Sequence, residues 1–154
     1  MGAWGSGLQA NDCALDAIGW FKDNFPIEVN AFMQTMKDTW GVDWTDGVLG
    51  LTDYLLDAGM SLSQFAESMP LIQEAIAKKK TSLELARWDH PNYPWFAPTQ
   101  AECNLRRRID ERLEVLEMFE ARLQGKPYDQ EKMAEMNKGL LTKWSSEYPT
   151  TQPD

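Results

Sequence analysis

An all-α fold is predicted by two features of this sequence. Apolar residues recur at three- and four-residue steps along most of the chain, as they do on one face of an amphipathic helix. No stretch alternates apolar and polar residues over the length of a strand, and β-branched residues are scarce. We therefore expect a single-domain bundle of five to seven helices over residues 1–147, followed by a loose tail at 148–154.

An N-terminal coil is expected to pack on this bundle. Three glycines surround Trp4 in a segment too permissive for a regular helix or strand. A tryptophan in such a setting predicts a buried anchor for the coil. Asn11 or Asp12 can then cap the first helix, because apolar residues at helical spacing follow directly.

The same opening carries a motif, M-G-x-W-G-x-G followed by N-D-x-A-L-D. The residues that form it are Met1, Gly2, Trp4, Gly5, Gly7, Asn11, Asp12, Ala14, Leu15 and Asp16. It resembles the start of a family of small, uncharacterised bacterial proteins, a domain of unknown function. The resemblance implies a bacterial or phage source and implies no particular chemistry.

Caps, glycines and prolines delimit the helices. The periodic segments are 12–24, 27–40, 46–58, a short stretch from the capping box Ser61–Gln64, 70–88, 99–123 and 129–145. Thr45 or Asp46 is the expected N-cap of the third segment. Pro70 predicts either a kink or a new helix that starts near Ser68 with the proline in its first turn.

The composition narrows the possible partners. The formal net charge of −9 disfavours direct binding to nucleic acid, whose phosphates would repel the chain. No apolar run approaches the roughly 18 residues that a membrane span needs, so we expect a cytoplasmic protein without membrane contact. No Walker loop, dinucleotide fingerprint or zinc-protease motif occurs, and we expect no cofactor.

The negative charge is concentrated in residues 41–69, which contain five acids and no Lys or Arg. Asp43 opens this segment, and helical spacing places Asp46, Asp53 and Asp57 near one face of the third helix. One interpretation is a solvated helix face. The other is that these four aspartates steer the protein toward a basic surface on a partner protein.

A proline-rich loop over residues 88–98 concentrates aromatic side chains, namely Trp88, Tyr93, Trp95 and Phe96. Such rings often carry binding energy at protein interfaces. Three interpretations stay open: the rings form core at one end of the bundle, they form a partner-binding edge, or they line a pocket for a small ligand.

Catalytic residues are not expected. His90 is the sole histidine, and neither Cys13 nor Cys103 lies in a recognisable nucleophile or metal motif. We expect a structural role for His90, two buried thiols and no metal site.

Two classes of function remain after these exclusions. The favoured one is a non-enzymatic acidic protein that inhibits or regulates a partner protein, as a toxin-neutralising immunity protein or a phage counter-defence inhibitor does. The partner would present a basic surface, for example one that normally holds nucleic acid. The alternative is a small enzyme or ligand-binding domain that uses carboxylates, His90 and the aromatic loop.

Overall fold

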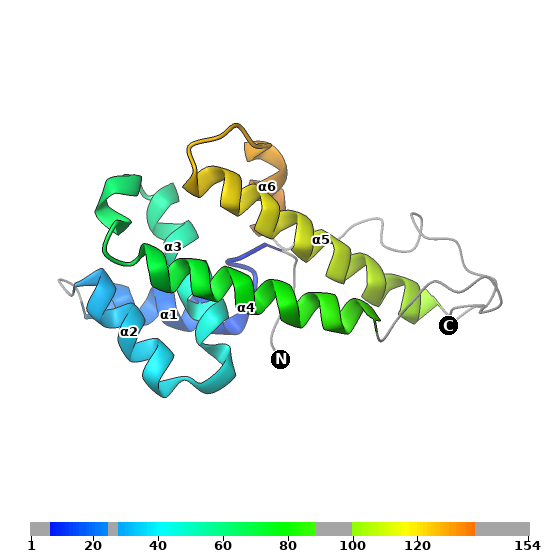
Figure 1. The fold of residues 1–154 in the computed structure, drawn as a ribbon, viewed down its shortest axis with the longest axis horizontal. Coiled ribbons are helices and arrows are strands. Elements are labelled where there is room, and N and C mark those ends of the chain that lie inside the picture. Colours follow the sequence, from blue (N-terminus) through cyan, green and yellow to red (C-terminus); the bar gives the residue numbers. More distant parts are fainter. Residues whose placement is uncertain (1–6, 25–27, 89–99, 138–154) are drawn as a thin grey trace.

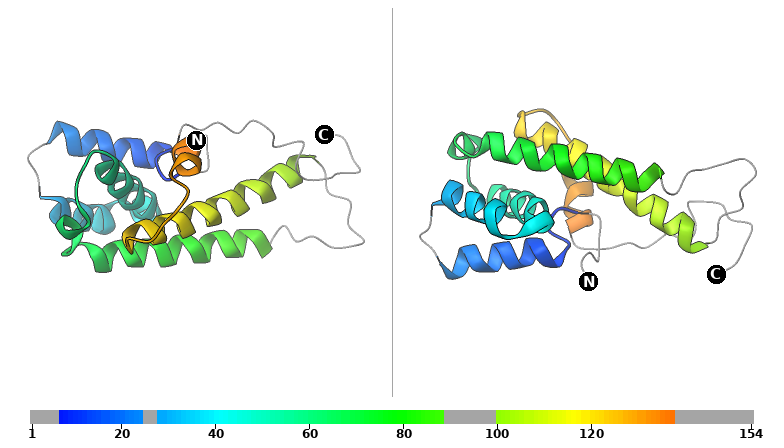
Figure 2. Two further views of the ribbon diagram at one scale, coloured as in Figure 1. Left: turned by 90° about the horizontal axis from the view of Figure 1, so that it is seen from above. Right: turned by 60° about the horizontal axis from the view of Figure 1, so that its bottom comes forward.

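Helix α3 (Trp44–Asp57) lies in the middle of the fold, with α1 (Asp12–Asp23) and α4 (Met69–Trp88) on opposite sides of it (Figure 2). The protein is described here from a computed structural model, which describes residues 7–24, 28–88 and 100–137. Within these ranges the chain forms α-helices and short 3-10 turns and no strand, which confirms the predicted all-α bundle.

The other elements surround this three-layer arrangement. Helix α2 (Val29–Thr39) leads through the 3-10 turn η1 (Gly41–Asp43) into α3, and the turn η2 (Leu62–Phe65) leads into α4. Helix α5 (Gln100–Leu123) runs back along α4 as a long antiparallel partner, and α6 (Gln130–Asn137) folds over the C-terminal end of α5 (Figure 1).

The sequence of α3 explains its central position. Apolar residues occur nearly all round this helix, as expected of a helix covered on several sides, and Val48, Leu49 and Leu51 are almost fully buried. Two glycines let neighbouring helices approach its backbone. A Cβ at Gly47 would lie 2.9 Å from the sulfur of Met36, and a Cβ at Gly50 would collide with Ala14 of α1.

Several predicted boundaries are confirmed. The side chain of Asn11 accepts a hydrogen bond of 2.8 Å from the backbone N–H of Ala14 and caps α1. Gly41 and Gly125 end their helices with positive φ angles of 62° and 71°, a conformation that other residues avoid. Pro70 is the second residue of α4, where its missing N–H breaks no helical bond.

Two predicted boundaries are wrong. Helix α3 starts at Trp44 instead of at Thr45 or Asp46, because the turn η1 continues directly into it and its N-cap Asp43 makes no side-chain cap bond. The capping box of Ser61 and Gln64 is present, but it opens a four-residue 3-10 turn instead of an α-helix.

The coil before α1 packs on the bundle from Gly7 onward. The Gly7 N–H donates to the carbonyl of Met136 at 3.1 Å, and Ala10 is fully buried. Trp4 lies outside the described residues, so its predicted anchoring role stays a prediction. The predicted extension of α6 to residue 145 and the tail at 148–154 also lie outside them.

Candidate functional site

A buried carboxylate joins four segments of the chain. Asp53 on α3 is 0% exposed. Its Oδ2 accepts hydrogen bonds of 2.8 Å from Gln9 Nε2 in the N-terminal coil and 2.8 Å from Asn137 Nδ2 at the end of α6. Its Oδ1 accepts a bond of 3.0 Å from Arg122 Nη1 on α5. A buried charge is tolerated in a protein when it is paired and hydrogen-bonded in this way.

Asp57, one turn further along α3, shares two of these donors. Arg122 Nη1 donates to its Oδ1 at 2.7 Å, and Gln9 Nε2 donates to its Oδ2 at 3.0 Å. Unlike Asp53, Asp57 has a side chain that is 50% exposed. We call these five residues, Gln9, Asp53, Asp57, Arg122 and Asn137, the Asp53 cluster.

Burial and charge shift the pKa values in this cluster. Burial raises the pKa of Asp53, the charge of Asp57 acts in the same direction, and the hydrogen bonds from Gln9 and Asn137 offset only part of the rise. Burial acts to lower the pKa of Arg122, but its hydrogen bond to Asp57 and the charges of both carboxylates outweigh that effect and raise it. Arg122 therefore stays a cation that bridges two acids.

A pocket of about 330 Å³ opens beside the cluster. Asp57, Arg122 and Asn137 line one side of it together with Tyr128, whose ring centroid lies 6.0 Å from the guanidinium carbon of Arg122. Leu56 of α3 and Met133 and Ala134 of α6 also line it, but Met133 is almost fully buried and most of the accessible lining is polar.

The structure corrects the interpretation of α3 as an acidic face for steering. Asp53 is inside the protein, and Asp57 is paired with Arg122. Asp46 forms an ion pair of 2.9 Å with Lys79 on α4. The aspartates of α3 therefore face cations of α4 and α5 in the same chain. Asp53 is covered and cannot contact a partner protein.

Asp43 is the exception among the four predicted aspartates, because it is exposed in the turn η1. Its charge, with those of Asp46, Asp16 and Asp12, adds to burial in raising the pKa of the Cys13 thiol. These acids therefore gather around the first turns of α1. Cys13, predicted to be buried, is only partly buried, and its raised pKa disfavours the reactive thiolate.

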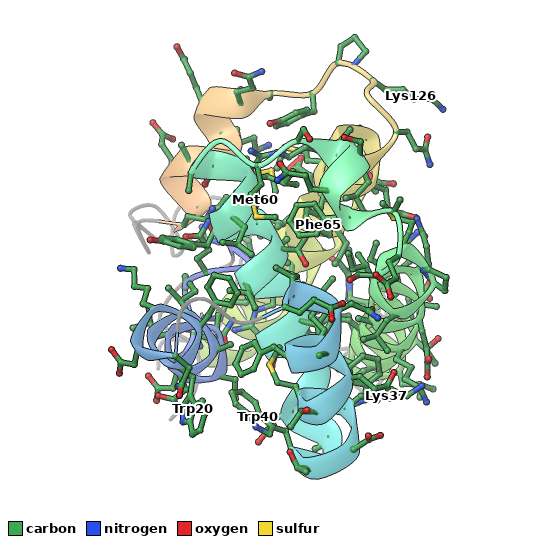
Figure 3. The ribbon with its side chains drawn as sticks, turned by 90° about the vertical axis from the view of Figure 1, so that its left-hand side faces the viewer. Trp20, Lys37, Trp40, Met60, Phe65 and Lys126 are labelled. Atoms are coloured by element: carbon green, nitrogen blue, oxygen red, sulfur yellow. The ribbon has the colours of Figure 1, made fainter. Side chains whose placement is uncertain are left out.

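Large apolar side chains are exposed beside these acids. Trp20 is 57% exposed, Leu15 on the same helix is 50% exposed, and Val42 next to Asp43 is 89% exposed. Figure 3 shows Trp20 projecting from α1 toward the lower edge of the molecule, where Trp40 also lies. We call this area the α1–η1 surface and define it by Asp12, Leu15, Asp16, Trp20, Val42 and Asp43.

The predicted aromatic site falls largely outside the described residues. Trp88 is the last residue of α4, and its side chain is not among those described. Tyr93, Trp95, Phe96 and His90 lie in residues 89–99, outside the described part, as does the side chain of Cys103. Their predicted roles stay predictions.

Some residues of these sites had no clear signal in the sequence. Gln9 precedes the first helix, and Asn137 lies within the predicted last helix, so neither carries a motif. Arg122 follows a common pattern, a cation in the last turn of a helix. Trp20 could have been identified, because it falls off the apolar stripe formed by Ala14, Ala17, Ile18 and Phe21.

No family model, curated protein or solved structure matches the chain in comparisons with known proteins. Among the helices in the described part of the chain, none is long and apolar enough to cross a membrane. The described residues also contain no group of three or more His, Cys, Asp or Glu side chains arranged to hold a metal ion.

Proposed function

We propose that this protein is a non-enzymatic acidic binding protein that inhibits or regulates a partner protein, and that it contacts this partner through the α1–η1 surface. The observation that carries the proposal is the exposure of Trp20 on a helix whose other exposed residues are mostly acids. Tryptophan is among the residues that most often supply binding energy at interfaces.

Apolar exposure supports this choice of surface. The exposed large hydrophobic side chains of the described residues are Leu15, Trp20, Val42 and Leu85, and three of these four belong to the α1–η1 surface. Trp20 stacks on Phe32 of α2 with ring centroids 6.3 Å apart, so its exposed side is held in a defined orientation. A rigid aromatic anchor loses little conformational entropy when it binds.

The negative charge of the α1–η1 surface supports a basic partner. Asp12, Asp16 and Asp43 are exposed, and the ion pairs found among the described residues do not include Asp16 or Asp43. Carboxylates around an apolar anchor favour a partner that places Lys or Arg around an apolar pocket. The acids of this surface thus take the steering role that the sequence assigns to α3.

Affinity capture tests the proposal. Wild-type protein immobilised at its C-terminus is incubated with extract of the source organism, and bound proteins are quantified by mass spectrometry. We expect a stoichiometric protein that is retained by wild type and lost with Trp20→Ala. Leu85→Ala removes an equally exposed apolar side chain on α4 and serves as the matched control, with capture unchanged.

The contribution of the acids to binding is measured separately, as an association rate. With the captured partner purified, Asp16→Asn and Asp43→Asn combined should slow association several-fold at low salt, and the difference should shrink at high salt. A partner whose capture and association rate are the same for wild type, Trp20→Ala and the double variant would remove the α1–η1 surface from the proposal.

A further inference from the structure

The outer face of α1 has a gap in its middle. Leu15, Gly19 and Asp23 are spaced four residues apart and form one of the ridges that a helix presents to its neighbours. A Cβ added at Gly19 would meet no atom of the described residues within 4 Å, and its φ angle is not one of the positive ones. Neither packing nor backbone conformation therefore requires glycine at this position. Glycine weakens the helix there and leaves room for another chain to approach α1.

Apolar side chains border the gap. Leu15 lies one turn before Gly19 in the same ridge, and Trp20 lies next to it in the neighbouring ridge. Both side chains are at least half exposed. The stacking of Trp20 on Phe32 of α2 fixes the side of the ring that faces solvent. A second helix that places its own ridge in the gap can bury both side chains at once.

Acids lie at both ends of the gap. Asp16 precedes Gly19 by three residues and Asp23 follows it by four; both are exposed, and the ion pairs found among the described residues include neither. Lys22, the basic residue of α1, lies 5.2 Å from the centroid of the Tyr54 ring, so its charge is on the side of α3. The helical rise separates the two acids by about 10 Å along α1. Two basic residues the same distance apart on a second helix, two turns from each other, can meet both acids.

We propose that the partner protein contacts the α1–η1 surface with an amphipathic helix that lies along α1 and approaches it most closely at Gly19. Apolar residues of this helix contact Leu15 and Trp20, and Arg or Lys residues two turns apart pair with Asp16 and Asp23. The inference rests on the proposed function, which names the surface, and adds the structure and charge pattern of the element that binds it.

A synthetic peptide of about 18 residues tests the inference on the full chain. It carries leucines at helical spacing and arginines two turns apart beside them. A matched peptide of the same charge has prolines at two central positions, which prevent a helix. Binding is followed in nitrogen–proton NMR spectra by the shifts of the Gly19 amide and of the Trp20 indole N–H, the latter assigned with Trp20→Phe.

We expect the helical peptide to shift both signals saturably and the proline peptide to bind at least tenfold more weakly. Equal binding of the two peptides would show attraction by charge alone and contradict the inference, as would a Gly19 amide that the helical peptide does not shift.

Substitution at the gap locates the site. Gly19→Leu fills the gap without disturbing a contact within the described chain, so it should keep or raise Tm while it weakens binding of the helical peptide at least tenfold. Ala77→Leu adds a leucine at an exposed position on α4 and should bind the peptide as wild type does. Peptide binding by Gly19→Leu that equals that of wild type would overturn a helix along α1.

The same variant separates this inference from the proposed function. In the affinity capture with source extract, loss of the partner with both Trp20→Ala and Gly19→Leu supports the inference. Loss with Trp20→Ala but unchanged capture by Gly19→Leu would keep the α1–η1 surface as the binding surface and contradict the close approach at Gly19.

Discussion

Asp53 illustrates how one residue can have a role that its neighbours in the sequence do not reveal. It belongs to a run of acids, but it is the one that faces inward and is fully covered. The donors that surround it come from residues 9, 122 and 137, so the carboxylate holds together parts of the chain that are far apart in sequence. Removing one of these donors takes a hydrogen bond away from a buried carboxylate, which costs stability.

The raised pKa of Asp53 predicts a measurable pH dependence. Between the ordinary pKa of about 3.9 and the raised value, the folded state binds more protons than the unfolded state. This group therefore lowers the free energy of unfolding as pH rises through that window, and Asp57 and Arg122 are the charges that face it. Denaturant titrations from pH 4 upward should show that Asp53→Asn lacks this contribution.

Asp38→Asn, at an exposed position on α2, is the control for that experiment and should keep the wild-type pH dependence. If the free energies of unfolding of Asp53→Asn and wild type differ by the same amount at every pH, the pKa of Asp53 is the same in the folded and unfolded states.

At the scale of the element, α3 depends on small residues where other helices approach it. Gly50 faces Ala14 and the carbonyl of Leu8, and a Cβ there would lie 2.9 Å from that carbonyl oxygen. Gly19 on α1 has the opposite surroundings, because a Cβ added there would meet nothing within 4 Å. Both glycines lie inside helices and have the same backbone propensity. They differ only in what packs around them.

This contrast predicts opposite effects of the same substitution. Gly19→Ala should stabilise the protein by about 0.5–1 kcal/mol, since alanine is the better helix former and no contact is disturbed. Gly50→Ala should destabilise it by about 1–3 kcal/mol, because α1 and the coil must move apart. Urea unfolding of both variants measures the two values, and a stabilising Gly50→Ala would contradict the close packing of α1 on α3.

At the scale of the whole molecule, the Asp53 cluster joins both ends of the described chain to its centre. Gly7 bonds to Met136, and Gln9 donates its backbone N–H to Asn137 Oδ1 at 3.0 Å. The acids of α3 are likewise matched by cations of α4 and α5. Asp16 and Asp43, on α1 and η1, stay exposed.

Asn137→Ala tests how the Asp53 cluster holds the two ends of the described chain together. It removes one donor to Asp53 and one acceptor for Gln9, and it should cost about 1–3 kcal/mol. Hydrogen exchange at Gly7 and Gln9 should accelerate more than exchange in α3. Asn30→Ala, which removes an asparagine bonded to Ser68 and Glu67, is the matched control and should leave Gly7 and Gln9 unaffected.

The sequence by itself determined the fold class and most helix boundaries, because periodicity and caps act within a few residues of one another. The Asn11 cap, the glycines at 41 and 125 and the place of Pro70 are all local effects of this kind. Only the tertiary structure decided which acids of α3 are buried, since helical spacing places Asp46, Asp53 and Asp57 on one face but does not say what covers that face. The partners of Asp53 lie 44, 69 and 84 residues away along the chain, and no pattern in the sequence joins residues at such separations.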